Sequence, residues 1–243
     1  MSTEEYDFNP FESPQAPASP VGARTKSKVK WARPFASGRV AAVVTIALLA
    51  IVMISDLIGS WCCFGHVWLL EHAASPATIQ AHSRLMALML GANALALLAT
   101  GGAFVVWTYF VYRNLPALGA LQPESTPVKA AGWYFVPVAW FAMPYVVMGE
   151  IWGQSDPAQI DKLRKKSSPL VKIWWALFLA WWVAWYLASF QAPDRFAVDA
   201  TNFRNAALAI QFITGIAAIL LVFQVDRNQQ AKHDCIARQS RDA

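Results

Sequence analysis

Two of the three cysteines and three of the four histidines crowd into residues 62–82, and these are the side chains best suited to bind a metal. They are Cys62, Cys63, His66, His72 and His82. Thiolate and imidazole groups are preferred zinc ligands, and Cys62 and His66 would share one face of a helix. However, the spacing matches no standard zinc pattern, and adjacent cysteines on an oxidising face can also be oxidised together or simply pack. Metal binding and plain packing both stay open for this cluster.

Charged residues stand near the ends of apolar runs and form two expected pairs. Arg113 and Glu150 flank two runs, whereas Asp56 and Arg84 lie near the ends of two others. Ionisable groups at helix ends are tolerated, whereas those at the midplane of a bilayer usually mark function. We therefore expect two structural ion pairs. In the alternative, Arg113 and Glu150 hold a lipid headgroup or an ion.

Three uncharged polar residues lie inside apolar runs. Asn93, Gln211 and Thr214 are accompanied by alanines and glycines that permit close helix contact. Hydrogen bonds across such a contact predict a packing core, and the same trio can instead line a solute path. No internal repeat suggests the paired halves of a transporter.

The elements that must position these residues are membrane helices. The chain has 243 residues, of which 56% are hydrophobic and 14% charged, and it contains 12 tryptophans. Apolar runs cover residues 40–55, 85–112, 130–149, 173–193 and 205–225. A bilayer span needs ~20 residues, which the first run reaches only if its helix continues past Asp56 to about Ser60. The basic residues lie beside these apolar runs and not on a separate polar domain. Their expected negatively charged partner is therefore the membrane surface and not a nucleic acid.

The distribution of Lys and Arg indicates that four of the five runs cross the membrane. Positive charge is retained on the cytoplasmic side. If all five runs cross, the 20 basic residues divide equally between the two sides. If residues 130–149 enter and leave by one face, 17 of the 20 lie inside, with both termini.

The third run also contains Pro137 and Pro144, which disfavour a straight helix. We therefore predict an all-α integral membrane protein with four transmembrane helices and a Pro-kinked interfacial or re-entrant segment. Five spans are the alternative, because membrane helices often tolerate proline.

The regions outside the helical domain, residues 39–226, are predicted to be cytoplasmic tails. Residues 1–38 read as a disordered tail with a basic juxtamembrane stretch, and residues 227–243 as a C-terminal tail. The N-terminal tail is a candidate site for a cytoplasmic protein partner. Anionic lipids are the expected partners of four basic residues in one inner loop, Lys162, Arg164, Lys165 and Lys166.

Several motifs resemble the bacterial domain of unknown function 4328 family. They are WTYFVYRNLPALG at 107–119, GWYFVP at 132–137, PYVVMGEIW at 144–152, SDP at 155–157 and the paired tryptophans at 174–175. The resemblance extends over about residues 40–225 and implies a bacterial membrane protein with a compact helical core. It implies no activity, catalytic residue or cofactor.

We expect a non-enzymatic protein of the bacterial inner membrane that acts through protein or anionic-lipid contacts. A small-solute or ion transporter is the alternative. A third hypothesis is a metal-handling or enzymatic site in the first external loop, which contains the cysteine and histidine cluster of residues 62–82. No cofactor is expected, and the oligomeric state is left open.

Overall fold

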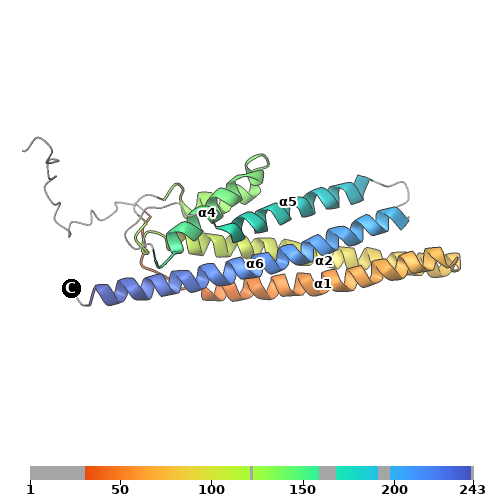
Figure 1. The fold of residues 1–243 in the computed structure, drawn as a ribbon, viewed down its shortest axis with the longest axis horizontal. Coiled ribbons are helices and arrows are strands. Elements are labelled where there is room, and N and C mark those ends of the chain that lie inside the picture. The colour runs from red at the N-terminus through yellow and green to blue at the C-terminus, as the bar shows by residue number, and fades with distance from the viewer. Residues whose placement is uncertain (1–30, 121–122, 159–167, 191–197, 242–243) are drawn as a thin grey trace, which may run out of the picture.

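The computed structural model describes residues 31–120, 123–158, 168–190 and 198–241. Its described residues form helices and connecting turns, with no strand among them. Four helices are long: α1 (Arg39–Glu71), α2 (Pro76–Arg113), α5 (Pro169–Phe190) and α6 (Val198–Gln239). Between α2 and α5 lie four short elements, α3 (Pro127–Gly132), η1 (Trp133–Phe135), η2 (Ala139–Phe141) and α4 (Met143–Ser155). Figure 1 shows the long helices lying side by side.

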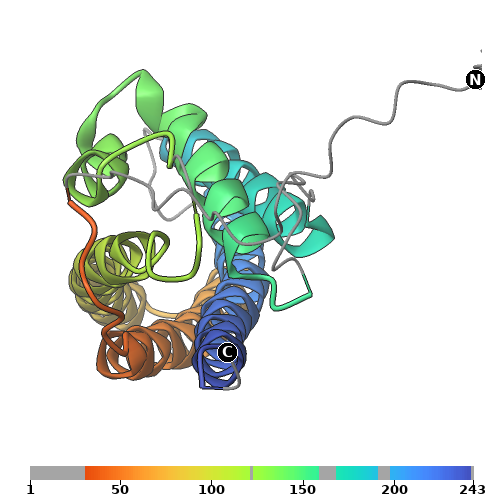
Figure 2. The same cartoon turned by 90° about the vertical axis from the view of Figure 1, so that its left-hand side faces the viewer.

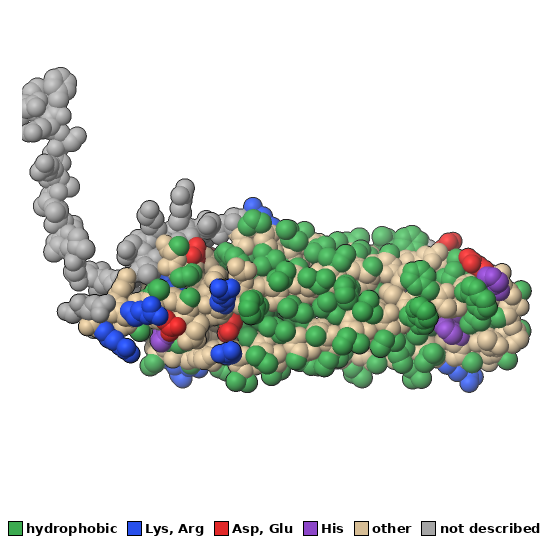
Figure 3. All heavy atoms as spheres, turned by 60° about the horizontal axis from the view of Figure 1, so that its bottom comes forward, with side chains coloured by type: hydrophobic (Ala, Val, Ile, Leu, Met, Phe, Trp, Pro, Cys, Tyr) green, Lys and Arg blue, Asp and Glu red, His purple; other side chains and the backbone are tan. Residues whose placement is uncertain are grey.

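Within the described ranges, these four helices are the ones that are long and apolar enough to cross a membrane. Within the most apolar window of α6, 50% of the residues are buried, against 17–28% in the other three helices. α6 is therefore the central helix. Large apolar side chains of α1 face outward, as Trp61 and Val40 show at 80% and 79% exposure. Figure 3 shows the resulting apolar band, with charged side chains gathered toward the two ends. The prediction of an all-α protein with four membrane helices is confirmed.

The third apolar run is broken and returns to the end from which it starts. Pro137 lies between η1 and η2, and Pro144 occupies the first turn of α4, where its missing amide hydrogen costs no helical bond. At the start of the segment, the amide of Ser125 donates to the hydroxyl of Tyr112 at 2.9 Å. At its end, Ser155 contacts Gln229, which also donates to the carbonyl oxygen of Val111. Both ends of residues 124–155 thus lie beside the C-terminus of α2, as the expected re-entrant segment requires.

The tip of this segment reaches well into the apolar band. Trp140 packs edge-on against Trp182 of α5, with ring centroids 4.9 Å apart. Trp182 is 13 residues into α5, a distance of about 20 Å from Pro169 along the helix axis. Toward the outside, the tip presents Phe135 and Val138, which are 74% and 87% exposed. An apolar surface of this kind suits contact with lipid.

Two helices are longer than the sequence indicated. α1 continues to Glu71, and α2 starts at Pro76 with Ser75 as its cap, so only a short turn joins them. The expected first external loop is thus mostly helical. α6 has 42 residues, or about 63 Å, roughly twice the thickness of hydrocarbon. Its last turns therefore project beyond the bilayer and form most of the expected C-terminal tail.

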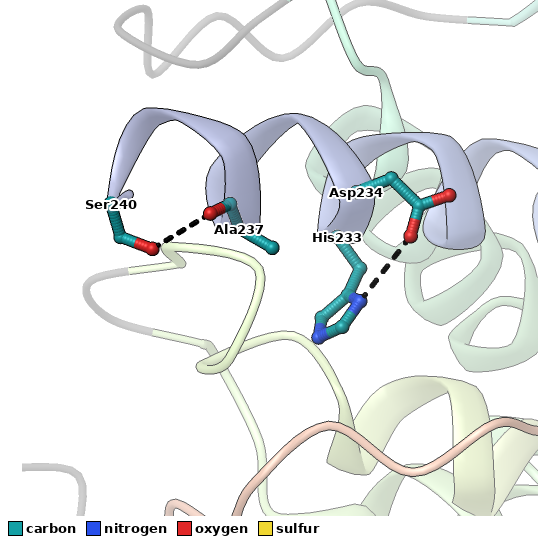
Figure 4. A network of polar contacts seen from close by, with 4 residues as sticks. All are labelled: His233, Asp234, Ala237 and Ser240. Carbon is teal, nitrogen blue, oxygen red and sulfur yellow. Dashed lines mark hydrogen bonds and ion pairs between the residues drawn. The ribbon is translucent and has the colours of Figure 1, made fainter. Parts of the chain in front are cut away.

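The start of the described chain and the end of α6 lie at the same end of the molecule. Phe35 stacks on His233, with ring centroids 4.2 Å apart. Nδ1 of His233 is also 3.7 Å from Oδ1 of Asp234 (Figure 4). Figure 4 also shows the hydrogen bond that the hydroxyl of Ser240 donates to the carbonyl oxygen of Ala237, near the end of α6. Figure 2 looks onto this end with the last turns of α6 toward the viewer, and Figure 1 shows that α6 projects past the short elements of the re-entrant segment. We call it the basic end, because exposed cations gather there: Arg33, Arg39, Arg227, Arg238 and Arg241.

Candidate functional site

Three buried polar side chains from three helices meet inside the bundle. Asp56 of α1 is 1% exposed, and Asn93 of α2 and Gln211 of α6 are each 6% exposed. Oδ1 of Asp56 accepts a hydrogen bond from Nδ2 of Asn93 at 2.8 Å and another from Nε2 of Gln211 at 2.7 Å. Gln211 also donates to Oδ1 of Asn93 at 3.2 Å. We call these three residues the membrane cluster.

The membrane cluster corrects the expected pairing of Asp56 with Arg84. α1 and α2 form an antiparallel hairpin with a short turn, so the residue of α2 opposite Asp56 is fixed by helix length. That residue is Asn93, whereas Arg84 lies nine residues earlier, about 14 Å along α2. The ion pair was expected because Asp56 was placed near the outer end of the first span, but α1 continues beyond it to Glu71.

One oxygen of Asp56 has no hydrogen-bond partner among the described residues. It is Oδ2, which is buried. Next to the cluster is a cavity of about 10 Å³, lined by Ser55, Asn93 and the apolar surface of α1, α2 and α6. This is about the room that one water molecule needs. A buried carboxyl group in a membrane helix is costly, so it usually has a packing or functional reason.

Thr214 does not join Asn93 and Gln211. Its hydroxyl donates to the carbonyl oxygen of Ile210 in its own helix at 2.8 Å. The polar trio expected from the sequence is therefore replaced by Asp56, Asn93 and Gln211. Among the described residues these three are sealed in the bundle and open no polar path through it.

The five cysteine and histidine side chains lie on the α1–α2 hairpin and its turn. His66 and His82 stack at 5.5 Å between ring centroids, and His72 stacks on Trp68. Cys62 and Cys63 are free thiols, and Cys63 packs with Met86 and Leu208. The described residues contain no group of three or more His, Cys, Asp or Glu side chains placed to hold a metal ion. A loop that folds back could have brought these five side chains together around a metal ion. Because they are distributed along two antiparallel helices and their turn, they do not converge on one point.

A second polar network fastens the re-entrant segment at the basic end. We call it the end network, and its members are Tyr112, Asn114, Glu150, Ser155, Gln229 and Lys232. All six are buried, with exposures of 0–8%. Its bonds join α2 and α4 to the projecting part of α6, and they include one from Lys232 to the carbonyl oxygen of Gln154 at 2.7 Å. Asn114 exchanges hydrogen bonds with the backbone of Ala36, which ties down residues before α1.

Glu150 is held by neutral donors, which corrects the expected pair with Arg113. Oε2 of Glu150 accepts from the hydroxyl of Tyr112 at 2.7 Å, and Oε1 accepts from the amide of Glu124 at 2.8 Å. No ion pair joins Arg113 to Glu150 among the described residues. Adjacent residues of a helix point in different directions, so Tyr112 faces the core and Arg113 does not.

Arg113 instead lies over Phe110, with Cζ 5.9 Å from the ring centroid. Phe110 is one wall of a groove of about 370 Å³ between α1 and α2. The other lining residues are Ser37, Gly38, Val40, Ala41, Val44, Ala103 and Val106. The groove therefore has apolar walls on two membrane helices and Ser37 at the basic end, and Arg113 lies over one of its lining residues, Phe110.

The expected lipid-binding residues Lys162, Arg164, Lys165 and Lys166 lie outside the described residues. So do residues 1–30 of the N-terminal tail.

Sequence reasoning missed Tyr112, Gln229 and Lys232 as members of a network. A signal was present for the last two. Buried residues of α6 recur at Leu221, Val225, Gln229 and Lys232, which continue a helical stripe past the end of the apolar run. Polar residues on a stripe that packs must find buried partners.

The comparisons with known proteins add a family but no relative of known role. Residues 71–227 match a family model described as Domain of unknown function (DUF4328). Neither the curated proteins nor the solved structures gave a match.

Proposed function

Because the chain belongs to the family described as Domain of unknown function (DUF4328), whose description assigns no activity, we propose a role from its surface chemistry. The protein is a non-enzymatic component of the bacterial inner membrane that acts at the inner face through anionic lipids and a cytoplasmic protein partner. Both termini face the cytoplasm in this proposal.

The observation that carries the proposal is the concentration of positive charge around the end network. Exposed Arg33, Arg39, Arg227, Arg238 and Arg241 lie at the end where the re-entrant segment begins and finishes. Basic side chains beside membrane helices attract anionic lipid by about 1 kcal/mol per charge near the surface. The end network supports this face, because buried hydrogen bonds fix α2, α4 and α6 relative to one another.

The protein partner is proposed to bind the N-terminal tail. The described residues 31–38 run across the basic end and are anchored through Ala36 and Asn114. This anchor holds residues 31–38 at the same face as the exposed basic side chains, which supports a binding site for a cytoplasmic protein at this end.

The lipid part is tested by measuring the unfolding temperature of the full chain in vesicles. Phosphatidylcholine alone is compared with phosphatidylcholine containing phosphatidylglycerol, each at low and high salt. We expect anionic lipid to raise the midpoint, and salt to diminish the increase because surface charge is screened. An equal midpoint in both compositions at low salt contradicts the proposal.

The transporter alternative needs a conformation in which the membrane cluster meets water. In the described residues, the cluster has room beside it for about one water molecule. We therefore propose a packing role for Asp56, Asn93 and Gln211.

A further inference from the structure

We infer that the groove between α1 and α2 at the basic end binds one anionic phospholipid, with an acyl chain in the groove and the headgroup phosphate against Arg113. This inference rests on the proposed function and names the ligand of one site within it.

The walls of the groove suit an acyl chain. Val40, Val44 and Val106 are 79%, 47% and 51% exposed, although they belong to helices that cross the membrane. Between them, Ala41, Ala103 and Gly38 keep the surface hollow. The groove's volume of about 370 Å³ falls in the range of small-molecule sites. Because its walls belong to two helices that are long and apolar enough to cross a membrane, we expect hydrocarbon tails of the leaflet around it.

Arg113 supplies the charge that selects an anionic headgroup. Among the described residues its guanidinium group has no acidic partner, and Glu150 instead accepts hydrogen bonds from the hydroxyl of Tyr112 and the amide of Glu124. The Nε atom of Arg113 is buried without a hydrogen-bond partner in the described chain. A guanidinium group suits a phosphate because it can donate two parallel hydrogen bonds.

The charge and the apolar groove are joined in one place. Phe110 lines the groove, and the guanidinium group of Arg113 lies over its ring at 5.9 Å. The two residues are three apart in the last turn of α2, so they share a face. A phosphate bound to Arg113 therefore stands directly above the apolar walls, as the headgroup of a phospholipid stands above its chains.

Ser37, just before α1, and Arg39, its first residue, complete the headgroup side. Ser37 lines the same groove, and its hydroxyl, which accepts from the amide of Arg39, can donate to a phosphate oxygen. Arg39 is exposed in the first turn of α1, where the helix dipole adds partial positive charge. Arg113 is the last residue of α2, and Ser37 lies two residues before the start of α1. We expect lipid headgroups to lie at this depth, because both membrane helices end there.

The test counts phospholipids retained by the full chain. The protein is extracted from vesicles of phosphatidylcholine and phosphatidylglycerol, and the lipids bound to it are identified by native mass spectrometry. We expect one phosphatidylglycerol to be retained in preference to phosphatidylcholine. Arg113→Gln is expected to lower this retention about fivefold, which corresponds to about 1 kcal/mol for one charge near the surface. Arg113→Lys should retain most of it.

Two matched controls separate the groove from general effects. Arg84→Gln removes a charge from the same helix at the opposite end and should leave retention unchanged. Ala103→Phe fills the groove and should lower retention, whereas Ala99→Phe, one turn earlier in α2 and outside the groove, should not. A photoreactive phosphatidylglycerol should label residues 37–44 and 103–110 in the wild type and lose this labelling in Ala103→Phe.

Several results would overturn the inference. Equal retention of phosphatidylglycerol by the wild type, Arg113→Gln and Ala103→Phe removes the groove as the site. If phosphatidylcholine is retained as well as phosphatidylglycerol, the site does not select an anionic headgroup. If the groove crosslinks to a second protein chain, its occupant is a helix of that chain and not a lipid. In each case the unfolding midpoint can still rise with phosphatidylglycerol, so the proposed function is judged separately. Variants that fold show the wild-type elution volume and circular dichroism, and the photolabelling of the wild type needs no substitution.

Discussion

Asp56 illustrates how one residue joins three helices. Its Oδ1 accepts from both Asn93 and Gln211, so removing the carboxyl group leaves two buried amide donors without their acceptor. Hydrogen bonds between membrane helices contribute modestly, mostly below 2 kcal/mol, but an unsatisfied buried donor adds its own cost. The side chain therefore stabilises the bundle through its oxygen more than through its charge.

This difference predicts unequal effects of two substitutions. Asp56→Leu should lower the free energy of unfolding in micelles by about 1–2 kcal/mol, because Asn93 and Gln211 lose an acceptor. Asp56→Asn retains an oxygen for both donors and should cost less. Equal losses in the two variants would show that the charge, not the acceptor, matters at this position.

Tyr112 is the residue on which the start of the re-entrant segment depends. Its hydroxyl donates to Glu150 and accepts from the amide of Ser125. Tyr112→Phe should therefore destabilise this junction by about 1–3 kcal/mol and speed hydrogen exchange of the amides at 124–132. Tyr109→Phe is the matched control in the same helix, because no hydrogen bond of its hydroxyl is found in the described structure. Unchanged exchange in Tyr112→Phe would mean that apolar packing alone holds the segment.

The elements show what the sequence could and could not specify. Hydropathy located all four membrane helices, and Pro137 and Pro144 marked the broken segment, because membrane spans and proline act locally. The partners of charged residues could not be predicted from such local signals, because they depend on how the helices pack against one another. Which residue opposes Asp56 depends on where α1 ends and α2 starts, and the break at residues 72–75 was assigned to a longer loop. The expected pair of Arg113 with Glu150 was wrong because the sequence did not indicate which residue at the end of α2 faces α4. In the structure that residue is the neighbouring Tyr112, which donates a hydrogen bond to Glu150.

Close contact between α1 and α6 yields a prediction at the same scale. A Cβ atom at Gly215 would lie 2.8 Å from Cγ of Met53, so a side chain there would displace Met53 from the contact between the two helices. Gly215→Val should lower stability by about 1–3 kcal/mol through overpacking. Gly102→Val is the matched control in α2, since a Cβ there meets no atom within 4 Å. Equal behaviour of the two variants would indicate that α1 can shift away from α6 at little cost.

At the scale of the whole molecule, most of the architecture follows from one segment turning back. Ser125 and Glu150, near the two ends of the segment, both form a hydrogen bond with Tyr112 at the C-terminal end of α2, so the chain leaves the membrane where it entered. The consequence is an even number of crossings. The basic residues before α1, around the re-entrant segment and after α6 then share one face, and the groove with Arg113 opens toward the leaflet on that side.

Single cysteines in a background without Cys62, Cys63 and Cys235 test this arrangement in sealed vesicles. Thr126→Cys lies at the start of the re-entrant segment and Ala158→Cys just after its end, and both should react with a membrane-impermeant maleimide from the same side as Ser240→Cys. Glu71→Cys, at the end of α1, should react from the other side. Reaction of Thr126→Cys and Ala158→Cys from opposite sides would make the third run a full crossing. The 20 basic residues would then be divided equally between the two faces, which removes the charge asymmetry on which a lipid-binding inner face depends.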